Sequence, residues 1–112
     1  MAEYPVPVTE ALLQEIANRI VEAFHPEKVV LFGSRAAGSP HADSDVDLLV
    51  IMETGGSPIQ RAVAVKRVAR PRFVAMDVLV KTPEEVAAQL RRGNFMLRQI
   101  LEDGRVLYER HA

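Results

Sequence analysis

Two short and mainly apolar runs, at residues 28–32 and 45–52, constrain the fold of this 112-residue chain more than any other feature. Each run is too short for a typical helix, and turn-forming residues flank both, which is the pattern of strands in a sheet. The first run ends at Gly33, and a third run of similar character covers residues 73–81. The sequence therefore predicts three strands, and residues 106–109 are candidates for a further strand at the edge of the sheet.

Segments with helical signals lie before, between and after these strands. Apolar residues recur at helical spacing over residues 9–24, and a second helix is predicted from Pro58 to about Arg70. A capping box at residues 82–85 starts a third helix, and a short fourth helix is predicted to end near Glu102. This order of elements predicts an α+β fold, in which helices pack on a small sheet.

The composition supports one domain and excludes several kinds of site. With 48% hydrophobic residues, residues 1–112 have material for a single core. A net charge of −1 gives no reason to expect direct binding to nucleic acid or to a membrane surface. The absence of cysteine excludes disulfides, zinc–thiolate sites and a thiol nucleophile. Since no uninterrupted stretch of apolar residues exceeds five and the start does not resemble a signal peptide, we expect a cytoplasmic protein.

Two acids stand in the second predicted strand. Asp45 and Asp47 are two residues apart, so their side chains point to one face of that strand, about 6.5 Å apart along the chain. Like charges so close are costly unless a cation lies between them. Mg²⁺ takes one or two carboxylates and keeps further positions for phosphates, so a magnesium site is one interpretation. The alternative is an edge strand with two solvated acids.

A third acid, Asp77, interrupts the apolar run at residues 73–81. If that strand lies beside the second, Asp77 comes within about 5 Å of the Asp45 and Asp47 pair. Three carboxylates on neighbouring strands are suited to a two-metal site for phosphoryl transfer, in which two bridge the ions and the third activates the attacking group. The alternative is that Asp77 merely faces solvent.

The turn after the first strand is a candidate for phosphate binding. Gly33 lets the backbone approach a ligand, and the Ser34 hydroxyl with nearby backbone N–H groups is placed to bind a triphosphate. Arg35 either pairs with a phosphate or lies on the surface. A P-loop is excluded because Ser39-Pro40 stands where Lys-Ser/Thr is required, and an EF-hand is excluded because Leu48 occupies the glycine position.

A basic stretch without acids covers residues 54–76. It forms either the solvated side of a helix or a docking surface for an anionic partner or nucleotide. Its five basic residues are Arg61, Lys66, Arg67, Arg70 and Arg72.

Taken together, these motifs resemble a known enzyme family. Gly33-Ser34, a spacer of ten residues, Asp45-x-Asp47 and the later Asp77 resemble the DNA polymerase β-type nucleotidyltransferase superfamily. The longer pattern Gly-Ser-Arg-Ala-x-Gly at residues 33–38, followed by Ser-Asp-x-Asp-Leu at residues 44–48, resembles the smallest branch of this superfamily, the minimal nucleotidyltransferases. Members of that branch are often encoded beside a HEPN-domain protein as an antitoxin–toxin pair. One departure is Ala37, where many relatives carry a second arginine.

The resemblance implies a palm-like fold with a mixed sheet, and it implies roles for the motif residues. The function implied is magnesium-dependent transfer of a nucleoside monophosphate, AMP from ATP, to a hydroxyl of a partner protein, with a HEPN-domain protein as that partner. The alternative is a non-catalytic binding module that masks a HEPN toxin. By position, two Mg²⁺ ions are assigned to Asp45, Asp47 and Asp77, and the nucleoside triphosphate to Gly33, Ser34 and Arg35.

Overall fold

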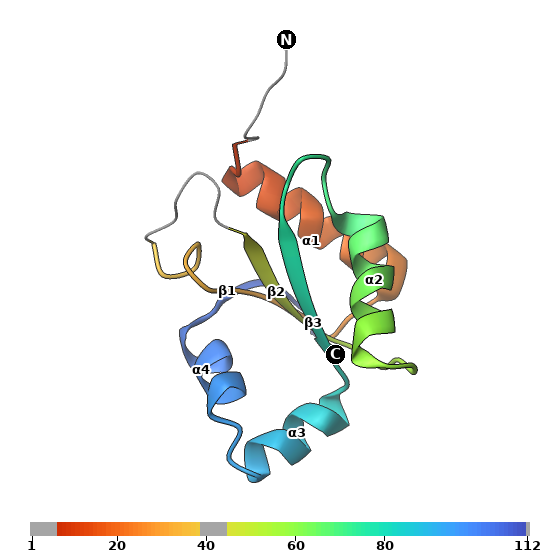
Figure 1. The fold of residues 1–112 in the computed structure, drawn as a ribbon, viewed down its shortest axis with the longest axis vertical. Coiled ribbons are helices and arrows are strands. Elements are labelled where there is room, and N and C mark those ends of the chain that lie inside the picture. The colour runs from red at the N-terminus through yellow and green to blue at the C-terminus, as the bar shows by residue number, and fades with distance from the viewer. Residues whose placement is uncertain (1–6, 39–44, 112) are drawn as a thin grey trace.

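The structure, a computed structural model, describes residues 7–38 and 45–111 of the chain. Its helices and strands are interspersed along the sequence, with β1 followed directly by β2 and α3 directly by α4, as Figure 1 shows. In chain order they are α1 (Glu10–Phe24), β1 (Lys28–Phe32), β2 (Val46–Ile51), α2 (Pro58–Ala69), β3 (Met76–Lys81), α3 (Pro83–Arg91), α4 (Phe95–Asp103) and β4 (Arg105–Glu109).

The strands form one mixed sheet with the order β3-β2-β1-β4. β1 pairs antiparallel with both β2 and β4, whereas β2 and β3 run parallel. A parallel pair requires a crossover between its strands, and α2 provides it. The α+β fold predicted from the sequence is confirmed, including the strand at the edge.

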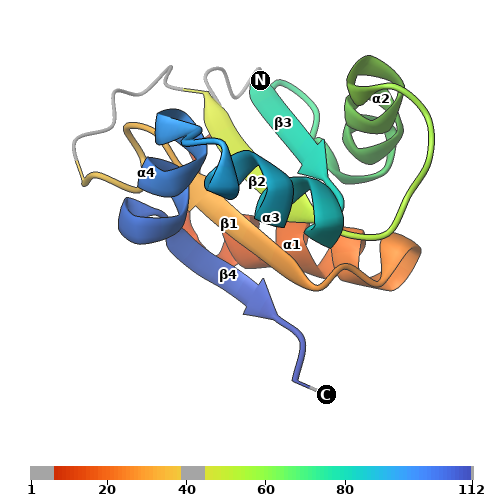
Figure 2. The ribbon, with the colours of Figure 1, turned by 90° about the horizontal axis from the view of Figure 1, so that it is seen from below.

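Helices cover both faces of the sheet. Figure 2 shows α3 and α4 on one face and α1 on the other, and α2 shares a hydrophobic core with α1. Because neighbouring residues of a strand point to opposite faces, β2 contributes to both cores. Leu48 and Val50 pack with the α1 side, while Leu49 and Ile51 pack with Ile100 of α4.

Local capping signals start the helices where the sequence predicts. The Thr9 hydroxyl accepts a hydrogen bond from the Leu12 N–H at the start of α1. Ser57 and Thr82 each form a complete capping box, and a proline follows each of them at the start of α2 and α3. These interactions satisfy N–H groups that a helix leaves unpaired in its first turn, so the boundaries follow from a few adjacent residues.

The start of the third strand differs from the prediction. The apolar run predicts a strand from Phe73, but β3 begins at Met76. Phe73 has a φ of 66°, and the Val74 N–H donates to the Pro71 carbonyl, so residues 71–74 form a turn. Hydrophobicity continues through this turn, which is why the sequence pattern does not mark it. No helix in the described part of the chain has the length and apolar character needed to cross a membrane.

Candidate functional site

The parallel pairing of β2 and β3 brings the three predicted acids together. Asp47 lies directly opposite Asp77 in the register, and the Val46 N–H donates to the Ala75 carbonyl at 2.9 Å where the pair begins. Asp45 stands immediately before β2. One carboxylate oxygen from each of Asp45, Asp47 and Asp77 lies within 4.8 Å of the other two. The expected proximity of Asp77 to the other two acids is therefore confirmed.

The acids on the strands face the α3 and α4 side of the sheet. Asp47 stands between Val46 and Leu48, which both belong to the core under α1, so its side chain points the other way. Asp77 stands between Met76 and Val78, which belong to that same core. The two carboxylates thus share a face, at the end of the sheet where both strands begin.

Burial and mutual repulsion make this cluster electrostatically unfavourable. Asp47 is half-buried, and its pKa is raised first by that burial and then by the charges of Asp77 and Asp45. Lys66 of α2 places its Nζ 3.8 Å from an Asp77 oxygen, and the two side chains are 36% and 69% exposed. One partly exposed ammonium does not balance three carboxylates. A hard divalent cation prefers oxygen ligands of this kind, so the donor set fits Mg²⁺.

Gly33 lies against the Asp47 carboxylate. Phe32 is the register partner of Asp47, and the chain turns at Gly33 with a φ of 78°. A Cβ at this position would overlap Oδ2 of Asp47 and lie 3.3 Å from its Cγ. Only glycine allows the turn to pass so close, so the close approach expected from the sequence is made to an acid of the cluster.

Ser34 and Arg35 lie in the turn that follows. Residues 34–38 form this turn, and the Ala36 and Ala37 N–H groups both donate to the Gly33 carbonyl at 3.1 Å. Those two N–H groups therefore donate within the turn and are not available to a phosphate. The prediction that backbone N–H groups after Gly33 bind phosphate does not extend to these two. Ser34 and Arg35 are both half-buried. Their proposed contacts with a nucleotide remain predictions.

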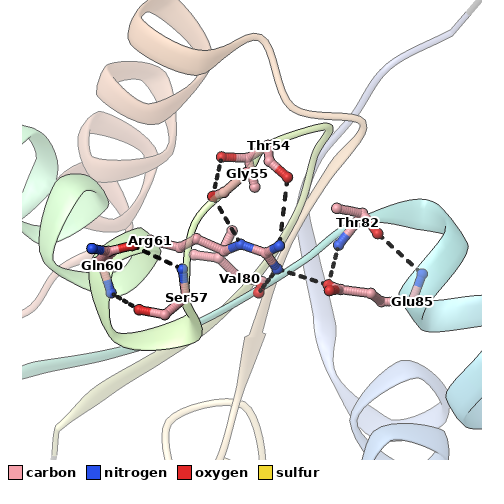
Figure 3. Close-up of polar contacts among 8 residues, drawn as sticks. All are labelled: Thr54, Gly55, Ser57, Gln60, Arg61, Val80, Thr82 and Glu85. Atoms are coloured by element: carbon pink, nitrogen blue, oxygen red, sulfur yellow. Dashed lines mark hydrogen bonds and ion pairs between the residues drawn. The ribbon is translucent and has the colours of Figure 1, made fainter.

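The basic stretch does not form one exposed surface. The Arg61 side chain is 9% exposed and pairs with Glu85 at 2.7 Å. It also donates to the Gly55 carbonyl at 3.2 Å and the Val80 carbonyl at 3.4 Å, as Figure 3 shows. The prediction that Arg61 belongs to a docking surface is therefore wrong. Its guanidinium joins the loop before α2 to the start of α3.

The other basic residues behave differently. Arg70 donates to the Val74 carbonyl at 3.2 Å, and the Arg72 guanidinium lies 5.0 Å from the centre of the Phe73 ring. Arg67 is exposed on α2. Sequence reasoning assigned Lys66 to the basic stretch and missed its contact with Asp77. The spacing of eleven residues between them carries no local signal, because α2 and β3 are brought together by packing.

Comparisons with known proteins agree with this geometry. A family model described as polymerase beta, nucleotidyltransferase, matches residues 14–112. A crystal structure of a candidate nucleotidyltransferase from Sulfolobus solfataricus is similar, with a TM-score of 0.62 and 24% identity. The similarity covers 89% of this chain and 79% of that one.

A second similar structure is a toxin–antitoxin complex with AMP-PNP, with a TM-score of 0.53 and 19% identity. That similarity covers 88% of this chain and 74% of the other chain. At such identities the two structures show a shared fold. No functionally curated protein sequence matches the chain.

Proposed function

Because the chain belongs to the polymerase beta nucleotidyltransferase family, we propose that it transfers AMP from ATP to a hydroxyl group of a partner protein. The observation that carries this proposal is the cluster of Asp45, Asp47 and Asp77, with one oxygen from each within 4.8 Å of the others. Clustered like charges destabilise a protein that makes no use of them, whereas a phosphoryl-transfer site needs them.

The reaction exchanges one phosphorus–oxygen bond for another. The acceptor oxygen forms a bond to the α-phosphorus while the bond from that phosphorus to the bridging oxygen breaks, and pyrophosphate leaves. Asp45 and Asp47, with Asp77, would hold the divalent metal, which would polarise the phosphate and neutralise its charge. The Ser34 hydroxyl donates a hydrogen bond to the triphosphate.

Asp77 is assigned the role of general base, which accepts the proton of the attacking hydroxyl. Its side chain is 69% exposed, whereas Asp47 is half-buried, so an acceptor arriving from outside reaches Asp77 more readily than Asp47. A general base must lie within hydrogen-bonding distance of the proton it accepts, and an exposed carboxylate next to Asp45 and Asp47 is placed to meet this requirement. Asp77 therefore orients the acceptor and receives its proton.

The exposed face of α2 is a suitable place for the acceptor protein to dock. Ile59 and Val63 are 77% and 45% exposed, and Arg67 continues the same face at a helical spacing of four residues. Lys66 lies beside this face and reaches Asp77. A partner with apolar and acidic side chains that docks here brings its hydroxyl to the acids. The toxin–antitoxin complex of similar fold supports a protein partner, and we assign that role to a HEPN-domain protein.

The test is transfer to a HEPN-domain protein encoded beside this chain. The two proteins are mixed with Mg²⁺ and ATP, and intact-mass spectrometry measures AMP addition. We expect efficient modification of the partner and very slow turnover by this protein alone, because an efficient transfer requires an acceptor held in line. Asp47→Asn should reduce transfer by about 10³-fold or more, since metal stabilisation is worth several kcal/mol. Glu22→Gln, which alters an exposed acid on α1, should have no effect.

Binding measurements separate the roles of the other residues. Calorimetry should show that Ser34→Ala weakens ATP binding by about 1.5–3 kcal/mol, the value of a hydrogen bond to a charged group. Asp77→Asn should retain ATP binding while it blocks transfer. Arg67→Glu should weaken association with the partner without changing ATP affinity. If the protein inhibits its partner yet binds no nucleotide at any metal concentration, the binding-module alternative replaces the transferase.

A further inference from the structure

A pocket adjoins the acidic cluster on the side of α4. It has a volume of about 330 Å³ and lies between the end of β1, the turn after it and α4. Gly33 lines the pocket, and a Cβ on Gly33 would overlap the Asp47 carboxylate, so the pocket and the acids share this residue. Phe32 lines it from the sheet and belongs to the face that Asp47 also occupies. A ligand with its phosphates at Gly33 therefore has this pocket directly beside it.

The pocket walls are mainly apolar. Phe32, Ala36 and Ala37 form one side, and Met96 and Ile100 of α4 form the other. Small alanine side chains leave room for a flat ring, and the thioether of methionine is polarisable and adapts to aromatic surfaces. The volume lies at the lower end of the about 300–1,000 Å³ typical of small-molecule sites. It suits a single heterocyclic ring system.

Two polar residues complete the lining. Gln99 and Asp103 belong to α4, one turn apart, and both line the pocket together with the apolar residues. A few polar groups in a mainly apolar cavity fix the orientation of a bound ligand. The Asp103 carboxylate only accepts hydrogen bonds, so it favours a ring that presents an amino group over one that presents a carbonyl there.

We infer that this pocket binds the base of the nucleotide, with Met96 and Ala37 against the ring and Asp103 accepting from its exocyclic amino group. The inference rests on the proposed function, because the phosphates at Gly33 place the base. Adenine presents an amino group where uracil presents a carbonyl, so the pocket selects ATP over UTP. The specificity of the transfer then resides in α4, outside the motif that contains the acids.

The test compares ATP with inorganic tripolyphosphate, which has the phosphates but no base. Both are titrated calorimetrically in the presence of Mn²⁺ against the full chain. Ala37→Leu narrows the pocket and Met96→Ala removes one wall, and Met96 is already 55% exposed, so its truncation does not disturb the core. Each variant should weaken ATP binding by about tenfold, the equivalent of one buried apolar contact, and leave tripolyphosphate binding unchanged. Phe95→Ala is the control, since Phe95 is 75% exposed on the same helix and does not line the pocket.

Asp103 is tested by base selection. The wild-type protein should bind ATP more tightly than UTP, and Asp103→Leu should reduce that ratio without changing the affinity for tripolyphosphate. Equal binding of ATP and tripolyphosphate by the wild-type protein overturns this inference while it leaves the phosphate and metal site intact. Binding of neither overturns the transferase proposal, and this inference with it. Equal losses of ATP and tripolyphosphate in Ala37→Leu also overturn the base pocket.

Discussion

Charged side chains are arranged in opposite ways at the two ends of the parallel strands β2 and β3. Where the strands begin, Asp47 faces Asp77, and the pKa of Asp47 is raised by burial and by the neighbouring acids. Where they finish, the guanidinium of Arg61 contacts Glu85 at 2.7 Å, and this hydrogen bond lowers the pKa of Glu85. One end leaves like charges together, and the other pairs opposite charges within the protein.

This difference separates a site for a ligand from an internal connection. A charged group removed from water is tolerated when hydrogen bonds and an opposite charge compensate it, and Arg61 has both. The carboxylates lack such compensation among the described residues, apart from the partly exposed contact between Lys66 and Asp77. The Arg61 end should therefore contribute stability, whereas the acidic end should reduce it until a cation binds.

The largest expected effect on stability comes from removing Arg61. Arg61→Leu removes the cation that pairs with Glu85 and one hydrogen-bond donor to each of the Gly55 and Val80 carbonyls. We expect the free energy of unfolding to fall by about 2–3 kcal/mol, measured by urea denaturation. The control is Arg19→Leu, which breaks an exposed pair with Glu15 and should cost less than about 0.5 kcal/mol. Similar losses in both variants would contradict the contrast drawn between the two ends.

The second effect comes from a methyl group at Gly33. Gly33→Ala places a side chain at a φ of 78° and displaces the Asp47 carboxylate. Gly93→Ala is a matched control, because Gly93 has a φ of 84° and nothing lies within 4 Å of its added Cβ. Both variants should lose about 1–2 kcal/mol of stability from backbone strain. Only Gly33→Ala should also lose Mn²⁺ affinity in calorimetry; equal Mn²⁺ binding by the two would show that the close approach does not matter.

The third effect is smaller and has the opposite sign. A carboxyl with a raised pKa stabilises the folded state below its unfolded pKa, and that contribution is lost as the pH rises through the folded pKa. At neutral pH and without metal, Asp45→Asn with Asp47→Asn should therefore raise the free energy of unfolding by about 0.5–1 kcal/mol. Millimolar Mg²⁺ should raise the melting temperature of the wild-type protein and not that of the double variant. If neither Mg²⁺ nor Mn²⁺ changes the melting temperature of the wild-type protein, the metal site is ruled out.

The smallest expected effect comes from Lys66, beside the acids. Its ammonium lies 3.8 Å from Asp77 and would repel a metal ion bound nearby. Lys66→Gln should therefore increase Mn²⁺ affinity about twofold, an amount in keeping with an exposed ion pair. Arg67→Gln removes the next charge on α2 and should change the affinity less, because Arg67 is exposed on another side of the helix. A decrease in affinity in Lys66→Gln would show that this residue supports the metal site.

The starts of several helices follow from residues that are neighbours in the sequence. Thr9, Ser57 and Thr82 accept hydrogen bonds from N–H groups three residues later, so the helix starts are set locally and were predictable. The missed start of β3 has a local cause of another kind. Phe73 adopts a left-handed conformation that few non-glycine residues take, and hydrophobicity does not report it.

The order of the strands along the chain, the starts of the capped helices and the identity of the motif residues follow from the sequence alone, although the start of β3 does not. The sequence supplied Asp45 and Asp47 two residues apart, and strand geometry alone turns that spacing into a shared face. Tertiary structure decided everything that depends on which elements become neighbours. The parallel pairing of β2 with β3 sets Asp77 opposite Asp47, and packing brings Glu85 to Arg61 across 24 positions. Such contacts form because whole apolar faces must be buried together, and no short stretch of sequence encodes which faces will meet.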